Sequence, residues 1–441
     1  MLLTEEIKME RELAYKLLRQ YEKKETISNE NVKQARTMLD ERSFGLFKSL
    51  VWGSIRNIAK EDWLISKFVD KPKDLTPASL WLLRLGFYQL ISGFDEHAAV
   101  YETVSLVSNK KNKSFINAVL RSYIRTKDTL GGEPENVKYL LPKWLYEYLR
   151  KKHTFSSSII RFNTTAPRRS IRVNSLKTSR EELLQMLADS KIAAQAAKYS
   201  PYGIYINEDS LALEETELYR KGYFYIQNES SQLVPVILNP QVGEHLLDLC
   251  SAPGGKCTFS AELMKNTGTI KAVDNDISRL EAVSANCKRH GITNVFAQLS
   301  DASEFKDVCE YDRLMLDVPC TSLGTAYAHP EVLFRVKKED FDRYAMIQKK
   351  ILSNVMNSIK VKGEIVYSTC TLSWEENTGN MKWLKNSFDV CFLDLRERLA
   401  SLGVKCHFDG YGAYIFQDEG LIPFYIAVFR KETLKTEEKN D

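Results

Sequence analysis

The first 130 residues carry apolar positions at helical spacing. Leu13, Leu17 and Leu18 form an apolar stripe on an otherwise charged segment, which is typical of an amphipathic helix. Further helical stretches are predicted at 41–60, 77–91, 97–107 and 114–126. About five helices with few strand signals indicate an all-α bundle, and a turn-rich run at 129–134 marks its end.

The next segment, 135–220, contains both helical and strand-like spacing of apolar residues. Helices are predicted at 142–152 and 179–190, the second with Ser179 as a candidate cap, and strands at 169–175 and 202–207. This pattern predicts a small α/β module between the helical domain and the rest of the chain.

From about residue 221 the chain alternates regularly between strand and helix patterns. Strands are predicted at 245–250, 269–274, 294–300, 312–319 and 364–370, with helices at 256–265, 278–290 and 339–359 between them. Such alternation predicts a parallel, doubly wound, Rossmann-like sheet, with two terminal strands at 389–395 and 422–431. We therefore expect a multidomain chain with domains at 1–130, 135–220 and 221–432, followed by a charged tail at 433–441.

Composition narrows the class of protein. The 441 residues contain no run of about 18 uncharged apolar residues, and the N-terminus is too charged for a signal peptide, so we expect a cytoplasmic protein. The net charge of +4 neither requires nor excludes a nucleic-acid partner. All eight cysteines lie between Cys250 and Cys406 without CxxC spacing, so nothing supports a zinc ribbon, and reduced thiols are expected.

A ligand-binding junction is indicated by LDLCSAPGGKCTFS (247–260), where a strand, a Pro-Gly-Gly turn and a helix follow one another. Gly254 and Gly255 let the backbone approach a ligand closely. Asp274, at the end of the next strand, is placed to accept ribose hydroxyls, and Asp301 follows the third strand, beside an adenine. The turn matches neither a dinucleotide fingerprint nor a triphosphate loop. The alternative is a structural glycine turn, which any α/β domain can contain.

Three motifs, CSAPGGK (250–256), LDVPCTSLG (316–324) and YSTCTLSWEEN (367–377), together resemble the RNA cytosine-C5 methyltransferases, the Sun/Nop2 group. The resemblance extends to RVNSLKTSREEL and YIQNESSQL, and LRLGFYQL, HAAVYETV and INAVLR resemble the NusB-like domain of the bacterial small-subunit rRNA members. It implies a seven-stranded methyltransferase sheet and methyl transfer from S-adenosylmethionine to carbon 5 of a cytosine in 16S rRNA. It further implies a monomer that acts on naked or early-assembly rRNA, without a metal or a membrane.

The resemblance also implies the cofactor residues. Those that line the methionine and ribose end are Cys250, Ser251, Ala252, Pro253, Gly254, Gly255 and Lys256. Asp274 holds the ribose, with the basic Arg279 after it, and Asp301 faces the adenine. Asp317 lies between the cofactor and the substrate.

Carbon 5 of cytosine is a poor nucleophile, and a thiolate that adds to carbon 6 activates it. Cys320 and Cys370 lie at predicted strand ends, where open α/β sheets bind ligands, and Asp317 is a candidate to protonate ring N3. The resemblance makes Cys370 the nucleophile and Cys320 the residue that helps product release. The positions of the two cysteines alone allow the roles to be swapped. The alternative without a catalytic role is two buried thiols. The other cysteines, Cys257, Cys287, Cys309, Cys391 and Cys406, are expected in packing roles, and Cys250 beside the cofactor.

Contacts to RNA are expected from basic clusters. The candidates are Lys110 and Lys111 in a loop, Arg168, Arg169 and Arg172 beside a strand, and His329 and Arg335 after the PC motif. A solvated surface is the alternative for the lysine and arginine clusters, and a loop residue with local partners is the alternative for His329. Glu375 and Glu376 follow the STC motif, and we expect them to lie at a helix N-terminus, where acidic side chains interact favourably with the helix dipole.

Two segments depart from the family pattern, at 419–429 and 322–328, which leaves their local contacts open. Two other functions also stay open: cytosine methylation of tRNA, and a non-catalytic RNA-binding or assembly role on a methyltransferase scaffold.

Overall fold

The structure is a computed structural model that describes residues 2–24, 26–207, 212–307 and 311–432. The predicted tail at 433–441 and Cys309 lie outside these residues. The chain divides into two compact units. One contains the described residues up to Lys151 together with Ala326–Val336, and the other contains those of Lys152–Thr325 and from Lys337 onward.

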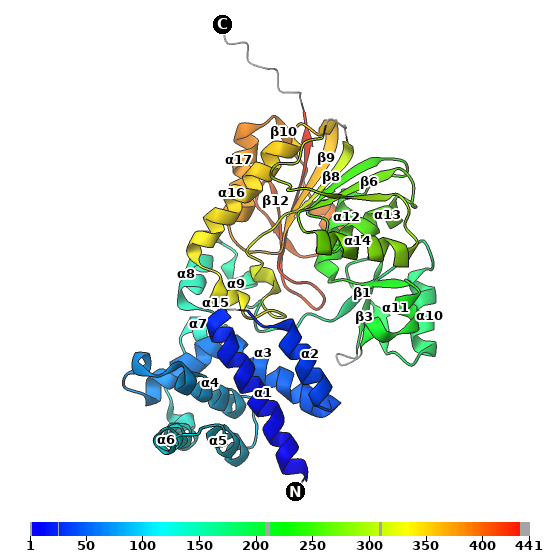
Figure 1. Cartoon of the computed structure of the whole chain (residues 1–441). Helices are drawn as coiled ribbons and strands as arrows, with labels where there is room; N and C mark the ends of the chain where they lie inside the picture. Colours follow the sequence, from blue (N-terminus) through cyan, green and yellow to red (C-terminus); the bar gives the residue numbers. More distant parts are fainter. Residues whose placement is uncertain (1, 25, 208–211, 308–310, 433–441) are drawn as a thin grey trace. The chain divides into compact units, whose positions relative to one another are not determined.

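The first unit is helical, as predicted (Figure 1). Its helices are α1 (Leu2–Lys24), α2 (Asn29–Met38), α3 (Glu41–Phe68), α4 (Pro77–Ile91), α5 (Glu96–Ser105), α6 (Lys110–Thr126), α7 (Glu135–Lys138), α15 (Val332–Arg335) and most of α8 (Lys143–Lys152). Asp40, Thr76, Asp95 and Asn109 each cap a helix through a side-chain oxygen. Helix α4 is apolar on most sides because it packs into two clusters, with Trp81 in one and Phe87 in the other.

The segment Ala326–Val336 belongs to the helical unit although it follows the PC motif. The Arg56 guanidinium on α3 lies 4.2 Å from the centre of the Tyr327 ring and donates to the Tyr327 carbonyl. Phe334 packs against the cluster that contains Phe47 and Leu50. The segment is therefore held by both a cation–π contact and apolar packing.

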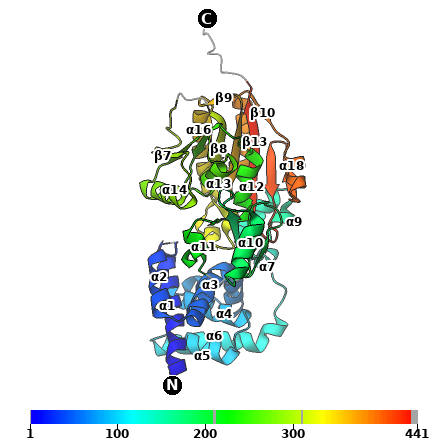
Figure 2. The same ribbon diagram turned by 90° about the vertical axis from the view of Figure 1, so that its right-hand side faces the viewer.

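The middle module has a four-stranded antiparallel sheet in the order β2-β3-β1-β4, which matches the predicted small α/β module. Its elements are β1 (Ser170–Val173), α10 (Arg180–Asp189), β2 (Ala194–Ala196), β3 (Gly203–Ile206), α11 (Glu217–Arg220) and β4 (Phe224–Ile226). Ser179 and Glu182 form a capping box at the start of α10, as the cap prediction required. Leu183 and Leu187 of α10 pack on the sheet, and α11 lies nearby (Figure 2).

The second unit contains this module and a larger domain that is built on a nine-stranded sheet. Its strands are β5 (His245–Leu249), β6 (Thr269–Asp274), β7 (Val295–Leu299), β8 (Tyr311–Asp317), β9 (Ile359–Thr369), β10 (Val390–Phe392), β11 (Cys406–Phe408), β12 (Gly412–Ile415) and β13 (Phe424–Lys431). Strands β7-β6-β5-β8-β9 are parallel and β13 pairs antiparallel with β9. The seven strands that the resemblance implies are joined by two short ones, β10 and β11.

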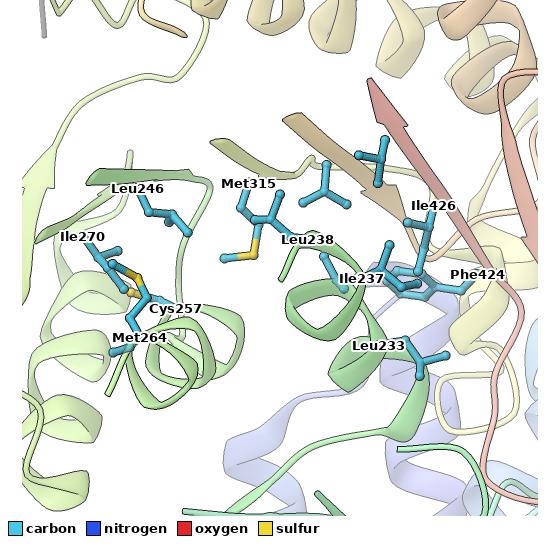
Figure 3. Packing of buried hydrophobic residues seen from close by; sticks show 14 of the residues in the cluster. Leu233, Ile237, Leu238, Leu246, Cys257, Met264, Ile270, Met315, Phe424 and Ile426 are labelled. Atoms are coloured by element: carbon cyan, nitrogen blue, oxygen red, sulfur yellow. The ribbon is translucent and has the colours of Figure 1, made fainter. Parts of the chain in front are cut away.

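Helices cover both faces of this sheet (Figure 1). They are α12 (Glu229–Leu238), α13 (Gly255–Leu263) and α14 (Ile277–His290) on one face, and α16 (Lys338–Val355) and α17 (Asn380–Ser387) on the other. In the first face's core, Leu233 and Leu238 of α12 lie with Met315, Phe424 and Ile426 of the sheet (Figure 3). This sandwich leaves the carboxyl ends of the parallel strands to hold ligands.

The cysteines outside the PC and STC motifs follow the packing prediction only in part. Cys257 is buried beside Met264 and Ile270 (Figure 3), and Cys287 is also buried. Cys406 is half-buried. Cys391 is exposed, which corrects the packing expectation, because it lies on the short edge strand β10.

Candidate active site

The loop between β5 and α13 turns sharply after Cys250. Cys250 has a φ of +66° and Gly254 a φ of +95°. A Cβ at Gly254 would lie 3.2 Å from the Cα of Val283 on α14, so this position combines a left-handed backbone with a close approach. The glycine turn predicted from the sequence therefore has a packing reason in addition to the predicted ligand-binding one.

Asp274 at the end of β6 organises the neighbouring loop. Its buried carboxylate accepts from the N–H of Ala252 at 3.1 Å and lies 3.4 Å from Nη1 of Arg279. The same Arg279 side chain donates to the Ala252 carbonyl at 2.8 Å. Two predicted cofactor residues thus hold the predicted cofactor loop from both sides.

One cavity of about 640 Å³ brings together most of the predicted site. Its lining includes Cys250, Ala252, Asp274, Arg279, Asp301 and Asp317 together with the thiols of Cys320 and Cys370. Apart from Arg279 on α14, these residues lie at or just after the carboxyl ends of β5, β6, β7, β8 and β9, where open α/β sheets bind ligands.

A second cavity of about 230 Å³ is lined by the remaining loop residues Ser251, Pro253, Gly255 and Lys256. Asp248 also lines it, and Gly254 lines neither cavity. Asp248 Oδ2 and Ser251 Oγ are buried and have no hydrogen-bond partner among the described residues. Buried polar atoms of this kind fit a polar ligand such as the amino-acid end of S-adenosylmethionine.

Asp317 and Lys256 form a close pair. Nζ of Lys256 lies 2.6 Å from Oδ2 of Asp317, and the Ser368 hydroxyl donates to Oδ1 at 2.8 Å. The pair is partly buried, with 14% of the Lys256 side chain and 32% of the Asp317 side chain exposed. The carboxyl group predicted to act on the substrate ring is therefore bonded to an ammonium group.

The two predicted catalytic thiols lie together. The sulfur atoms of Cys320 and Cys370 are 3.5 Å apart, at the ends of β8 and β9. A hydrogen bond from Cys320 lowers the pKa of Cys370, although burial opposes this effect. The same hydrogen bond and burial raise the pKa of Cys320 well above its usual value. The electrostatics favour Cys370 as the thiolate of the pair.

Gly324 ties the two cysteine loops together directly. It lies in the short 3₁₀ turn Leu323–Thr325, and its N–H donates to the Cys370 carbonyl at 2.8 Å. A Cβ at this position would lie 2.2 Å from the Pro423 carbonyl oxygen, so a side chain there would require the backbone to move.

The predicted dipole role of Glu376 needs correction. Glu375 and Glu376 begin a π-helical turn, Glu375–Gly379, and not an ordinary α-helix. Glu376 is fully buried, and its carboxylate contacts Thr321 in the loop of Cys320. Its partners are thus distant in sequence, which a local dipole argument cannot reveal.

Arg172 is not a surface residue, which corrects its predicted RNA-binding role. It is fully buried, because helix α13 and Tyr225 of β4 cover the face of β1 that carries it. Its guanidinium pairs with Glu262 at 2.8 Å and donates to Thr258 and to the Gly255 carbonyl. Arg172 therefore supports the helix that follows the cofactor loop.

The other basic candidates remain at least partly accessible. Arg168 donates to Asn207 at 2.7 Å, and Arg169 lies 3.9 Å from Glu214. Lys110 and Lys111 are exposed, but they begin helix α6 and do not lie in the predicted loop, because Asn109 caps that helix.

His329 and Arg335 lie in Ala326–Val336, the segment that belongs to the helical unit. The His329 side chain is 62% exposed and lies 3.5 Å from Glu331. Arg335 is exposed at the end of α15.

The atypical segment at 419–429 is anchored on α12. Asn228 donates to the Gly420 carbonyl at 3.2 Å, and the Ser230 hydroxyl donates to that of Ile422 at 2.8 Å. The altered turn is thus supported by polar residues of the YIQNESSQL motif.

Sequence reasoning missed several residues of the two cavities. Tyr344, Ile347 and Ile351 of α16 belong to an apolar face that predicts only packing, yet they line the larger cavity. Asp248 is a carboxyl group inside an apolar strand, and that contrast was the available signal. Burial raises the pKa of Asp248 well above its usual value.

Two classes of site receive no support from the geometry. Within residues 2–24, 26–207, 212–307 and 311–432, no group of three or more His, Cys, Asp or Glu residues is arranged to hold a metal ion. Across the same part of the chain, no helix is both long and apolar enough to span a membrane.

Comparison with protein families gives three matches along the chain. Residues 8–125 match the NusB family, residues 141–211 match the ferredoxin-like domain of RsmF/B-like methyltransferases, and residues 235–430 match the 16S rRNA methyltransferase RsmB/F family. A probable ribosomal RNA small subunit methyltransferase B of Bacillus subtilis is 31% identical over 385 residues, which are 83% of this chain and 86% of that protein.

Solved structures show the same fold. The crystal structure of PH0851 matches with a TM-score of 0.72 and 24% identity over 89% of this chain and 91% of that one. NSun6 from Pyrococcus horikoshii, crystallised with SFG, matches with a TM-score of 0.58 and 23% identity over 66% of this chain and 99% of its own.

Proposed function

The chain belongs to the 16S rRNA methyltransferase RsmB/F family, and from that premise we propose that it methylates carbon 5 of a cytosine in 16S rRNA through a covalent Cys370–carbon 6 bond. The enzyme is an S-adenosylmethionine-dependent RNA methyltransferase. The bound cofactor supplies the methyl group. Asp274, Arg279 and Asp301 would hold its nucleoside, and the 250–256 loop its amino-acid end.

One observation carries the proposal: a single cavity is lined by the cofactor candidates and by both thiols. A methyl donor and a target base bound there would share one cavity. A cytosine that is paired in a helix would have to leave its stack to reach the thiols.

The residues divide the chemistry between them. The Cys370 thiolate adds to carbon 6, and ring N3 takes a proton that Lys256 offers through Asp317. Carbon 5 of the resulting enamine takes the methyl group. The carbon 5 proton then passes to solvent water and the N3 proton returns to Asp317, which restores the carbon 5–carbon 6 double bond and expels the Cys370 thiolate. Cys320 assists this second half at 3.5 Å from the leaving sulfur.

The proposal is tested by cysteine variants on transcribed 16S rRNA. We expect Cys370→Ala to abolish methylation, because no thiolate then adds to carbon 6. We expect Cys320→Ala to accumulate a covalent protein–RNA adduct, detected as a slow band on a denaturing gel. Cys391→Ala, an exposed cysteine outside the cavities, is the matched control and should behave as wild type. An adduct in the Cys370 variant instead would reverse the two roles.

Mapping of 5-methylcytosine in cellular RNA tests the substrate. The NusB match at residues 8–125 favours rRNA over tRNA. Loss of one 16S rRNA cytosine methylation in cells without the protein would support the proposal. Loss only in tRNA, or no loss at all, would favour the tRNA enzyme or the non-catalytic factor.

The remaining basic residues are proposed as phosphate contacts that position the RNA. Lys110, Lys111, Arg168, Arg169, His329 and Arg335 keep this role. Arg172, which is buried, does not.

A further inference from the structure

Glu376 is a fully buried carboxyl group that lines neither cavity. It follows Cys370 by six residues, in the π-helical turn Glu375–Gly379. Buried carboxylates normally have a cationic partner, but the contacts of Glu376 are all to neutral donors. Burying a carboxyl group without a cation costs free energy, so the contacts of Glu376 indicate its role.

Both oxygens of Glu376 reach toward the loop of Cys320. Oε2 accepts from the N–H of Thr321 at 3.0 Å, and Oε1 lies 2.5 Å from the Thr321 hydroxyl. Gln348 of α16 donates to Oε2 at 3.0 Å and also to the Pro319 carbonyl at 2.8 Å. Residues on both sides of Cys320 are therefore held by one carboxyl group and its glutamine.

Asn377 does the same for the loop of Cys370. The Thr369 hydroxyl donates to its amide oxygen at 2.6 Å, and its amide nitrogen donates to the Thr371 carbonyl at 3.0 Å. Adjacent residues of one π-helical turn thus bracket the two cysteines separately.

The two brackets meet at a pair of hydroxyl groups. The Oγ1 atoms of Thr321 and Thr371 lie 2.7 Å apart, and each residue directly follows a cysteine. When Glu376 is charged, Thr321 donates to it and Thr371 donates to Thr321. When Oε1 of Glu376 carries a proton, every donor in this chain reverses, and Oε2 still accepts from both N–H groups. The network therefore holds in either state.

We infer that Glu376 is a positioning residue that sets Cys320 against Cys370 by clamping the two cysteine loops through Thr321 and Thr371. The inference rests on the proposed function, in which the two thiols act in succession on one substrate. Glu376 touches neither sulfur through a hydrogen bond among the described contacts, so its effect is on geometry. Its loss should harm the step that needs both thiols more than the step that needs Cys370 alone.

The test compares Glu376→Ala with Glu376→Gln, on transcribed 16S rRNA with radiolabelled S-adenosylmethionine. Glutamine can accept from both N–H groups and donate to Thr321, so we expect it to retain turnover. We expect alanine to lower multiple turnover on the order of 10²-fold, because small misplacements of reacting groups have effects of that size. We also expect it to accumulate the covalent adduct while the first methyl transfer and cofactor binding persist.

Glu375→Ala is the matched control, because this neighbouring glutamate pairs with Lys152 and makes no contact to Thr321 among the described hydrogen bonds. It should turn over at the wild-type rate. If Glu376→Ala does not fold, Thr321→Val carries the test, since it keeps the shape and removes only the bridging hydroxyl. It should accumulate the same adduct.

Normal turnover without an adduct in these variants would overturn the inference. So would an equal loss of first transfer, release and cofactor binding, which indicates general structural damage. Failure of the proposed function is distinct, because Cys320→Ala would then give no adduct in the same assay.

Discussion

Two buried glutamates in the second unit have opposite kinds of partner. Glu262 on α13 faces the Arg172 guanidinium at 2.8 Å and Nδ1 of His290 at 3.1 Å. Glu376 faces a backbone N–H, a hydroxyl and an amide. Burial raises the pKa of Glu376 to about 7 and lowers the pKa of His290.

The presence or absence of a cationic partner determines the role that each carboxyl group can have. An ion pair joins Glu262 to Arg172, and with it the middle module to the helix after the 250–256 loop. Glu376 has no such cation, so its proton can be present or absent near neutral pH while its hydrogen bonds persist. The 250–256 side is held by an ion pair, and the cysteine side by hydrogen bonds that involve no cation.

The largest expected effect comes from breaking the ion pair. Arg172→Met leaves Glu262 buried without a cation, and loss of one partner costs about 3–5 kcal/mol. We expect the free energy of unfolding, measured by urea titration, to fall by this amount. Hydrogen exchange of peptides from β5 and α13 should show the same loss of stability locally. The double variant Arg172→Met/Glu262→Leu should recover most of it, because no buried charge then remains. A single variant as stable as wild type would contradict the assignment of a buried pair.

The next largest effect is the contribution of Glu376 to the pH dependence of stability. Because the folded chain binds this proton more tightly than the unfolded one, its contribution to stability is complete below pH 4.5 and is lost as the pH rises toward about 7. The loss is about 3 kcal/mol. The titratable groups that face it are Tyr367 and the Cys320 thiol.

The measurement compares wild type with Glu376→Gln by urea unfolding at pH 5 and pH 8. The glutamine variant cannot titrate, so its stability should gain on wild type between these two values. Parallel curves for the two proteins would show that Glu376 keeps one protonation state throughout.

The smallest effect is expected for Glu375, whose side chain is 18% exposed and pairs with Lys152 at 2.7 Å. Glu375→Gln should change the free energy of unfolding by less than about 1 kcal/mol, because partly exposed pairs contribute little. A larger change, measured by the same urea titration, would mean that burial does not explain why Glu375 and Glu376 contribute differently to stability.

The sequence predicted the parts of the fold that depend on local pattern. The helix at 77–91 has its predicted bounds because Thr76 caps it and proline suits its first turn. The proximity of Cys320 and Cys370 was also predictable, since both follow adjacent parallel strands and such ends share one edge of the sheet.

The errors arise where a partner is distant in sequence. Arg172 has the composition of a surface strand residue, and only the packing of α13, some 85 residues later, buries it. Glu376 looks like a helix-start acid until Thr321, 55 residues earlier, is brought beside it. No spacing rule within a window of one helix contains either contact.

Gly324 has a consequence for attempts to change which RNA the enzyme recognises. Libraries that vary the loop after the PC motif can change its exposed positions, Ala328 and His329, in shape and charge. At this one position, however, any side chain would meet the Pro423 carbonyl, and the N–H donated to Cys370 would shift with it. Mutational tolerance along the loop should therefore be high at its exposed residues and low at Gly324, which belongs to the part of the loop that contacts the cysteine strands.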